Sequence, residues 1–173
     1  VIKKLLACLF CALIVFAISW GLYVKVFSQE KQATFNTNIK KDISPQDVLE
    51  AAENGNSDAQ YIVGLIYYKE ELYQQAAEWY LKSAIQGNAK AQFNLANKYY
   101  EGKGVEQNYK EAFKWYKKAS EQGHSQAQFN LGCMYGRGEG VKKDYAEANK
   151  WIYKAALHGN IEAQNWLQEL GEK

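Results

Sequence analysis

The side chains able to act as nucleophiles are few and scattered along this sequence. Ser28 and Lys31 have the Ser-x-x-Lys spacing with which serine enzymes of the β-lactamase class attack an acyl carbon. The companion motifs of that chemistry, Lys-Thr-Gly and Ser-Asp-Asn, are absent from the sequence. The Ser28–Lys31 pair alone therefore does not predict a hydrolase.

Histidine and cysteine, the common metal ligands, are equally sparse. His124 and His158 have no second histidine or cysteine at a spacing that could share a metal ion. Cys8 and Cys11 lie in an apolar N-terminal stretch and Cys133 stands alone, so no disulfide framework is implied. We expect no catalytic residue, no metal and no cofactor, and we interpret both histidines as polar loop residues.

The charge balance argues against another class of function. The chain carries 21 basic and 19 acidic side chains, and all three charges in residues 1–27 are lysines. The remainder is nearly neutral, and Arg137 is the only arginine in the sequence. Nucleic-acid-binding domains need clustered Lys and Arg and usually a clear basic excess. We therefore expect no nucleic-acid partner.

Residues 5–24 form an uncharged, apolar stretch that follows Lys3 and Lys4. At about 1.5 Å rise per residue such a helix spans about 30 Å, the thickness of one hydrocarbon core. The stretch predicts either an uncleaved membrane anchor or a secretory signal cleaved near Ser19. We favour the anchor because the hydrophobicity continues through residues 22–27. In both cases the leading lysines keep the N-terminus in the cytoplasm and the remainder on the other side.

The rest of the chain divides into a spacer and a folded domain. Residues 28–43 are polar and have no period, which predicts a spacer behind the N-terminal segment 1–27. Ser44 and Pro45 then predict the start of a helix, because serine caps helices and proline suits their first turn. We expect the folded domain to comprise residues 44–173.

The folded domain repeats itself at a fixed spacing. Glycine, alanine and tryptophan each recur 36 residues apart, at Gly87, Gly123 and Gly159, at Ala91, Ala127 and Ala163, and at Trp79, Trp115 and Trp151. A period of this length is typical of stacked helical units, none of which buries its apolar face alone. We expect repeats at about 55–87, 88–123 and 124–159, with a cap helix at each end, 45–54 and 160–170.

The pattern within each unit predicts two helices joined by a turn. In the middle unit two apolar stripes have helical spacing: Ala91, Leu95, Ala96 and Tyr99, and then Ala112, Trp115, Tyr116 and Ala119. Between the stripes, the glycine-containing turn 102–105 ends the first helix. Asn108 and Glu111 predict a capping box that opens the second helix.

The units resemble the Sel-1-like repeat, a relative of the tetratricopeptide repeat. The resemblance covers residues 52–170 and rests on Gly-x-Gly-Val turns at 102–105 and 138–141, on Ala-Gln pairs at 59–60, 91–92, 127–128 and 163–164, and on Lys82, Lys118 and Lys154. It implies an all-α solenoid of αα-hairpins that forms a right-handed superhelix. We predict that fold, preceded by one N-terminal transmembrane or signal helix.

In tetratricopeptide-like stacks the first helices line the concave face. Carried over by alignment, this implies partner-binding positions at Tyr61, Leu65, Tyr68, Phe93, Asn97, Tyr100, Phe129 and Arg137. Tyr61, Phe93 and Phe129 occupy the same position of the three repeats and form an aromatic row. Asn97 could form paired hydrogen bonds with a bound peptide backbone. The open alternative is that the three rings only pack between neighbouring first helices and that Asn97 is an ordinary surface residue.

The prediction for function is a protein–protein interaction scaffold, not an enzyme. It would bind a protein or peptide in its concave groove and be anchored in a bacterial inner membrane with a periplasmic repeat domain. The first alternative is a secreted, signal-cleaved repeat protein that acts on a host or envelope target. The second is a cell-wall or β-lactam hydrolase, an activity to which some members of the family have been linked, although no catalytic site is visible.

Overall fold

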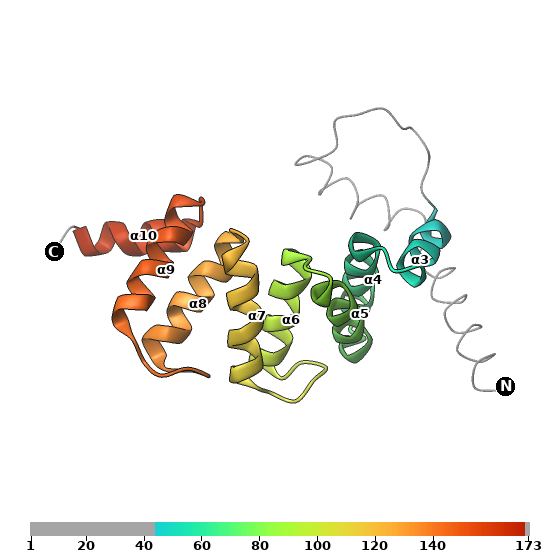
Figure 1. Ribbon diagram of the computed structural model, residues 1–173, viewed down its shortest axis with the longest axis horizontal. Coiled ribbons are helices and arrows are strands. Elements are labelled where there is room, and N and C mark those ends of the chain that lie inside the picture. The colour runs from blue at the N-terminus through green and yellow to red at the C-terminus, as the bar shows by residue number, and fades with distance from the viewer. Residues whose placement is uncertain (1–43, 172–173) are drawn as a thin grey trace, which may run out of the picture. The chain divides into compact units, whose positions relative to one another are not determined.

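The computed structural model describes residues 44–171 of the 173-residue chain. All regular structure in that range is α-helical (Figure 1). Within it, no helix is both long and apolar enough to cross a bilayer. The anchor or signal predicted at residues 5–24, the spacer 28–43 and the Ser28–Lys31 pair lie outside the described residues.

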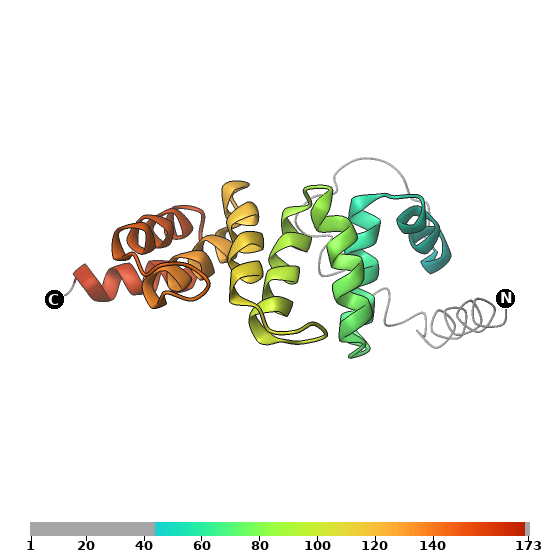
Figure 2. The ribbon, with the colours of Figure 1, turned by 60° about the horizontal axis from the view of Figure 1, so that its bottom comes forward.

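Eight helices follow one another in residues 44–171 and confirm the all-α repeat architecture. They are α3 (Pro45–Glu53), α4 (Ser57–Lys69), α5 (Tyr73–Ile85), α6 (Ala89–Glu101), α7 (Tyr109–Glu121), α8 (Ser125–Arg137), α9 (Tyr145–Leu157) and α10 (Ile161–Gly171). Among the described residues the chain divides into two units at Glu50 and Ala51, and the three helix pairs lie in the second. From α4 to α10 each helix packs on its neighbours in the sequence, as expected of a solenoid (Figures 1 and 2).

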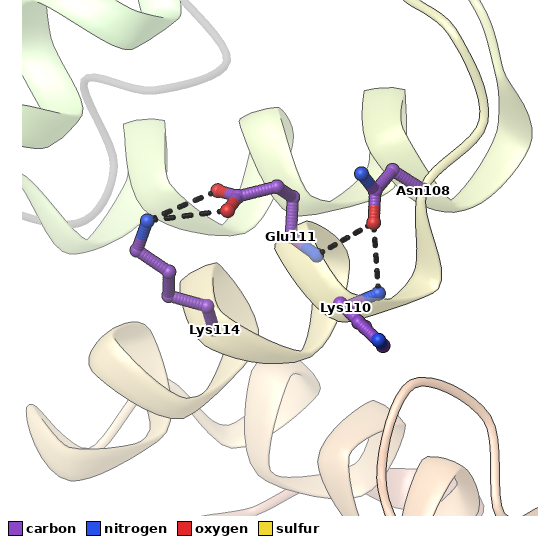
Figure 3. A network of polar contacts seen from close by, with 4 residues as sticks. All are labelled: Asn108, Lys110, Glu111 and Lys114. Carbon is purple, nitrogen blue, oxygen red and sulfur yellow. Dashed lines mark hydrogen bonds and ion pairs between the residues drawn. The ribbon is translucent and has the colours of Figure 1, made fainter.

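The second helix of the middle repeat begins with one half of the predicted capping box. The Asn108 Oδ1 accepts hydrogen bonds from the amides of Lys110 and Glu111, both 3.1 Å long (Figure 3). The reciprocal bond is replaced: the Asn108 amide donates to the Tyr99 carbonyl at 2.9 Å. The Glu111 carboxylate instead pairs with Lys114 at 3.2 Å. The helix start is therefore held by one side-chain cap and one backbone bond across the turn.

The core consists largely of alanine and a few large rings. Both predicted stripes of the middle repeat are confirmed, with Leu95, Ala96, Ala112, Trp115, Tyr116 and Ala119 all buried and Tyr99 packed against them. Small residues are required where helices cross closely. A Cβ atom added at Gly64 would lie 2.6 Å from ring atoms of Tyr80, so that position leaves no room for a side chain.

The second glycine of each Gly-x-Gly-Val turn touches the preceding repeat. Gly104 lies against the backbone of Tyr73 at the start of α5, where an added Cβ would come within 2.3 Å of the Tyr73 carbonyl. Gly140 makes the same approach to Tyr109 at the start of α7, at 2.2 Å. Both glycines also have positive φ, which other residues rarely adopt. The turns therefore join one repeat to the previous one.

The glutamines of the Ala-Gln pairs form a second connection, which we term the glutamine ladder. Each donates its side-chain amide to a carbonyl eight residues earlier: Gln60 to Ala52, Gln92 to Ala84, Gln128 to Ser120 and Gln164 to Ala156, at 2.9–3.0 Å. Those carbonyls lie near the end of the preceding helix, where backbone acceptors lack intrahelical partners. Gln86 and Gln122 then donate to the Oε1 atoms of Gln60 and Gln92.

Candidate functional site

The eight residues predicted to bind a partner lie on the first helix of each repeat, and we refer to them as the first-helix face. Tyr61, Leu65 and Tyr68 belong to α4, Phe93, Asn97 and Tyr100 to α6, and Phe129 and Arg137 to α8. Most of them are half-buried, while Tyr68 is 39% exposed and the Arg137 side chain 62% exposed. One pair is in direct contact, because the Arg137 guanidinium donates to the Tyr100 hydroxyl at 3.1 Å.

The aromatic row consists of Tyr61, Phe93 and Phe129, and each ring has one side in the core. The Tyr61 ring lies 6.2 Å from that of Tyr80 on α5, in a tilted arrangement. Phe93 lies 6.0 Å from Tyr116 on α7. Phe129 packs against the buried cluster at α9 and α10. The rings therefore contribute to packing, mainly against second helices, and their half-buried state leaves an edge at the surface.

Asn97 is oriented by a buried tyrosine. The Tyr116 hydroxyl donates a hydrogen bond to the Asn97 Oδ1. Burial raises the pKa of Tyr116, so the hydroxyl remains a donor at physiological pH. This bond fixes which end of the Asn97 amide faces Tyr116 and leaves the amino group as a donor for other partners. The Oδ1 has a second lone pair, so the paired hydrogen bonds that the sequence suggested would share this oxygen with Tyr116.

Tyr100 connects the second and third repeats through a polar contact. Its hydroxyl donates to the Glu139 carboxylate at 3.0 Å and accepts from Arg137, which lies 3.8 Å from the same carboxylate. Burial raises the pKa of Tyr100, and the hydrogen bond to Glu139 raises it further. The three side chains contact one another, so this end of the first-helix face is polar and its opposite charges are paired.

Two lysines and two tyrosines meet where the first repeat joins the second. The Lys98 ammonium lies 4.1 Å from the centre of the Tyr68 ring, and that of Lys103 lies 4.0 Å from the centre of Tyr73. The Lys98 side chain is only 4% exposed and pairs with Glu101 at 3.6 Å. Burial lowers the pKa of Lys98. Sequence reasoning missed this buried charge.

A signal for Lys98 did exist in the repeat alignment. Lys98 lies 36 residues before Met134, which is also buried, so a charged residue occupies an apolar position of the repeat. Buried lysines need a partner or an aromatic surface, and here Tyr68 supplies the surface.

His124 was also missed, because it reads as a loop residue in the sequence. It is the N-cap of α8, and its Nδ1 accepts the amide of Ala127 at 3.2 Å. Its ring stacks on that of Phe93, with centres 4.6 Å apart and planes 20° from parallel. The 36-residue spacing places it at the position of Asn88, the N-cap of α6, and this correspondence could have revealed its role.

The common metal ligands and the single described cysteine are dispersed over the repeats. Among residues 44–171, no three His, Cys, Asp or Glu side chains cluster closely enough to hold an ion. Cys133 is half-buried, and burial raises the pKa of its thiol, which disfavours the reactive thiolate. What this part of the chain offers a ligand is aromatic surface and hydrogen-bonding groups.

The chain matches known repeat proteins. The sequence profile of the Sel1 repeat matches residues 57–88, 89–124 and 125–160. A protective antigen of uropathogenic Escherichia coli with an SLR fold is 40% identical, with a TM-score of 0.69 over 72% of this chain and 27% of that one. A Sel1 repeat protein of Oxalobacter formigenes is 32% identical, with a TM-score of 0.68 over 73% of this chain and 98% of that one.

A third similar structure shows the shared fold at lower identity. The cysteine-rich protein B of Helicobacter pylori is 22% identical, with a TM-score of 0.57 over 76% of this chain and 98% of that one. Among curated proteins, no sequence matches the chain significantly. The chain spans about a quarter of the length of the Escherichia coli protein.

Proposed function

This chain belongs to the Sel1 repeat family, and from that premise we propose that it is a scaffold whose first-helix face holds a peptide or helix of a partner protein. Sel1 repeats generally form protein–protein interaction scaffolds, and proteins built from them are typically non-enzymatic. The partner is therefore a protein or peptide, recognised by surface complementarity and not turned over.

One observation carries the proposal: an aromatic ring recurs at the same position of α4, α6 and α8, with an oriented amide beside the middle ring. Tyr61, Phe93 and Phe129 are each half-buried, so a ligand can cover their remaining surface. Large rings lose little conformational entropy on binding and often dominate interface energies. The amino group of Asn97 would donate to a backbone carbonyl of the ligand and fix its register.

The test is in-cell crosslinking and co-purification with the full-length chain. Phe93→Ala with Asn97→Ala alters the first-helix face. Tyr153→Ala is the matched control, because Tyr153 is an aromatic residue on the second helix α9 and is 56% exposed. Circular dichroism should report equal helix content for all chains compared.

A partner captured by the wild type and by Tyr153→Ala, and lost from the folded double variant, supports the proposal. A partner that both variants retain moves the binding site away from the first helices. A partner lost only from Tyr153→Ala assigns binding to the second helices and overturns the proposal.

The membrane display that we propose is supported by the sequence of residues 5–24, which would anchor the chain in a bacterial inner membrane with the repeats in the periplasm. The second candidate is a secreted chain, cleaved near Ser19, that acts on a host or envelope protein. The similar Escherichia coli protein is described as a protective antigen, which favours this candidate. The same face would bind the target in both cases.

A further inference from the structure

The first helices of the array begin with equivalent N-caps, and one of these caps can titrate. In three cases an asparagine Oδ1 accepts the amide three residues later: Asn56 from Ala59, Asn88 from Ala91 and Asn160 from Ala163, at 2.7–3.0 Å. At α8 the acceptor is instead the Nδ1 of His124, which receives the amide of Ala127 at 3.2 Å. Asparagine does not titrate near neutral pH, whereas histidine does.

Protonation would remove this cap. The Nδ1 of His124 can accept only while it carries no proton, so the neutral ring must hold its proton on Nε2. An imidazolium donates from both nitrogens and would direct a donor at the Ala127 amide. It would also place a positive charge at the positive end of the α8 dipole.

The neighbouring first helix offers no acceptor or negative charge to a protonated His124. Asn88 and Asn160 donate to Asp58 and Gln126 on the preceding first helices, each at 2.8 Å. The equivalent position facing His124 is occupied by Lys90, which repels a protonated ring.

The other elements around the ring are neutral at the point of contact. From α6 the Phe93 ring stacks on His124, and from α7 the Ala119 carbonyl accepts its backbone amide at 3.1 Å. From α8 it meets the amide of Ala127. In the described part of the chain no carboxylate contributes to its electrostatics.

We propose that the junction between the second and third repeats is an acid-sensitive joint, which loosens when His124 takes up a proton. The protonated state loses the α8 cap and brings a cation toward Lys90, so the contact that holds α8 against α6 and α7 weakens. The joint follows from the cap geometry and does not depend on the proposed binding function.

The direction of the pH dependence follows from the burial of the ring. Burial lowers the pKa of His124 below its ordinary value of 6.5 and outweighs a backbone hydrogen bond that raises it, while Lys90 lowers it further. Between the lowered pKa and 6.5 the unfolded chain binds more protons than the native one, so stability rises with pH in that window. The contribution of neutral His124 to the stability of the fold is fully present above pH 6.5 and is lost as the pH falls through the lowered pKa.

His158, the other histidine, provides the matched control. Its Nδ1 lies 2.8 Å from the Gln128 Oε1, and Gln128 donates its own amide to Ser120. The Oε1 is therefore the acceptor and His158 the donor, a bond that the protonated ring also makes. The equivalent positions in the other two repeats are Gln86 and Gln122.

The experiment is hydrogen exchange on the full-length chain in mild detergent, at about pH 7.5 and about pH 5.5, the range in which histidine titrates. Wild type is compared with His124→Asn and His158→Gln, each of which installs the residue used by other repeats. The measured quantity is the protection of the amides at 127–130, the first hydrogen-bonded ones of α8, after division by the intrinsic exchange rate at each pH.

We expect wild type and His158→Gln to lose about fivefold protection on acidification, the factor that corresponds to an N-cap worth ~1 kcal/mol. His124→Asn should keep its protection. If His124→Asn loses protection as wild type does, or if His158→Gln abolishes the loss, the proposal is overturned. Circular dichroism at about pH 7.5, above the ordinary histidine pKa, should report equal helix content for the three chains.

Discussion

The hydroxyl of Tyr116 on α7 donates its hydrogen bond to the Oδ1 of Asn97 on α6. This bond joins the two helices of the middle repeat and satisfies a tyrosine that is only 2% exposed. In the first repeat the equivalent of Asn97 is Leu65, and in the third it is Cys133. The bond to Asn97 is thus a feature of the middle repeat, and its role in supporting a buried hydroxyl can be measured separately from ligand binding.

Asn97→Leu should destabilise the fold. It installs the residue of the first repeat and removes the Oδ1 to which the Tyr116 hydroxyl donates, so that this buried hydroxyl keeps only its contact with Asn130, at a cost of about 1 kcal/mol. Urea unfolding monitored by circular dichroism measures the change. Adding Tyr116→Phe removes that hydroxyl, so the double variant should recover part of the loss. Strictly additive losses would contradict a direct bond between the two side chains.

Gly104→Ala should destabilise more than Gly123→Ala. Both glycines have positive φ, 82° and 87°, which costs about 1–2 kcal/mol for alanine. An added Cβ at Gly123 meets nothing within 4 Å, whereas at Gly104 it lies 2.3 Å from the Tyr73 backbone. We expect Gly104→Ala to cost about 1–3 kcal/mol more in urea unfolding. Equal losses of stability in the two variants would mean that Gly104 does not lie in close contact with the start of α5.

Lys98→Met should leave the fold equally or more stable, by up to about 2 kcal/mol. Methionine is the buried residue at the equivalent position 134, and removing the ammonium ends the cost of burying a charge. The loss of the contact with Tyr68 limits the gain. Lys103→Met is the control and should bring no gain, because the Lys103 ammonium contacts Tyr73 and, unlike that of Lys98, has a raised pKa. A clear loss of stability in Lys98→Met would contradict this account.

The difference in free energy of unfolding between wild type and Lys98→Met should become smaller at high pH. Burial lowers the pKa of Lys98 below its ordinary value of 10.5, so between the two values the unfolded chain binds more protons. The stability of the wild type therefore increases relative to that of the variant as the pH rises toward 10.5. Urea midpoints of both chains at neutral and at alkaline pH measure the difference. A gap that stays constant would place the Lys98 ammonium in water.

The N-terminus of the mature chain distinguishes the two modes of display. We expect intact mass and N-terminal sequencing of membrane-purified protein to retain residues 1–19, because the apolar stretch continues beyond Ser19. A mature chain that begins at residue 20 and fractionates without membranes would favour the secreted candidate. Either outcome leaves the proposed role of the first-helix face to be tested independently.

The repeat architecture was predictable because its determinants are local and periodic. Leu95, Ala96 and Trp115 recur in phase with helical stripes, and each of them is buried as predicted. The turn at Gly104 followed from glycine chemistry alone. Periodicity sums many weak signals, so departures such as Ala96 in a usual glycine position did not obscure the fold.

The chemistry of single side chains was less predictable, because it depends on the partner across the helix pair. Nothing adjacent in the sequence indicates that Asn97 accepts from Tyr116, and the periodicity left open whether the aromatic row packs in the core or binds a partner. Lys98 and His124 depart from the repeat pattern, the first at a buried position and the second at an N-cap. Comparing each position with those 36 residues away would have detected both, whereas separate motif searches did not.

The glutamine ladder makes the array modular. Every repeat contains both the side chain that reaches backward and the carbonyl that receives the next glutamine, as Gln92 and Ser120 do in the middle repeat. Inserting or deleting a whole repeat therefore adds or removes one complete glutamine–carbonyl hydrogen bond and leaves no glutamine without its acceptor. Lineages could lengthen or shorten such a protein by unequal crossover within its gene without redesigning any junction.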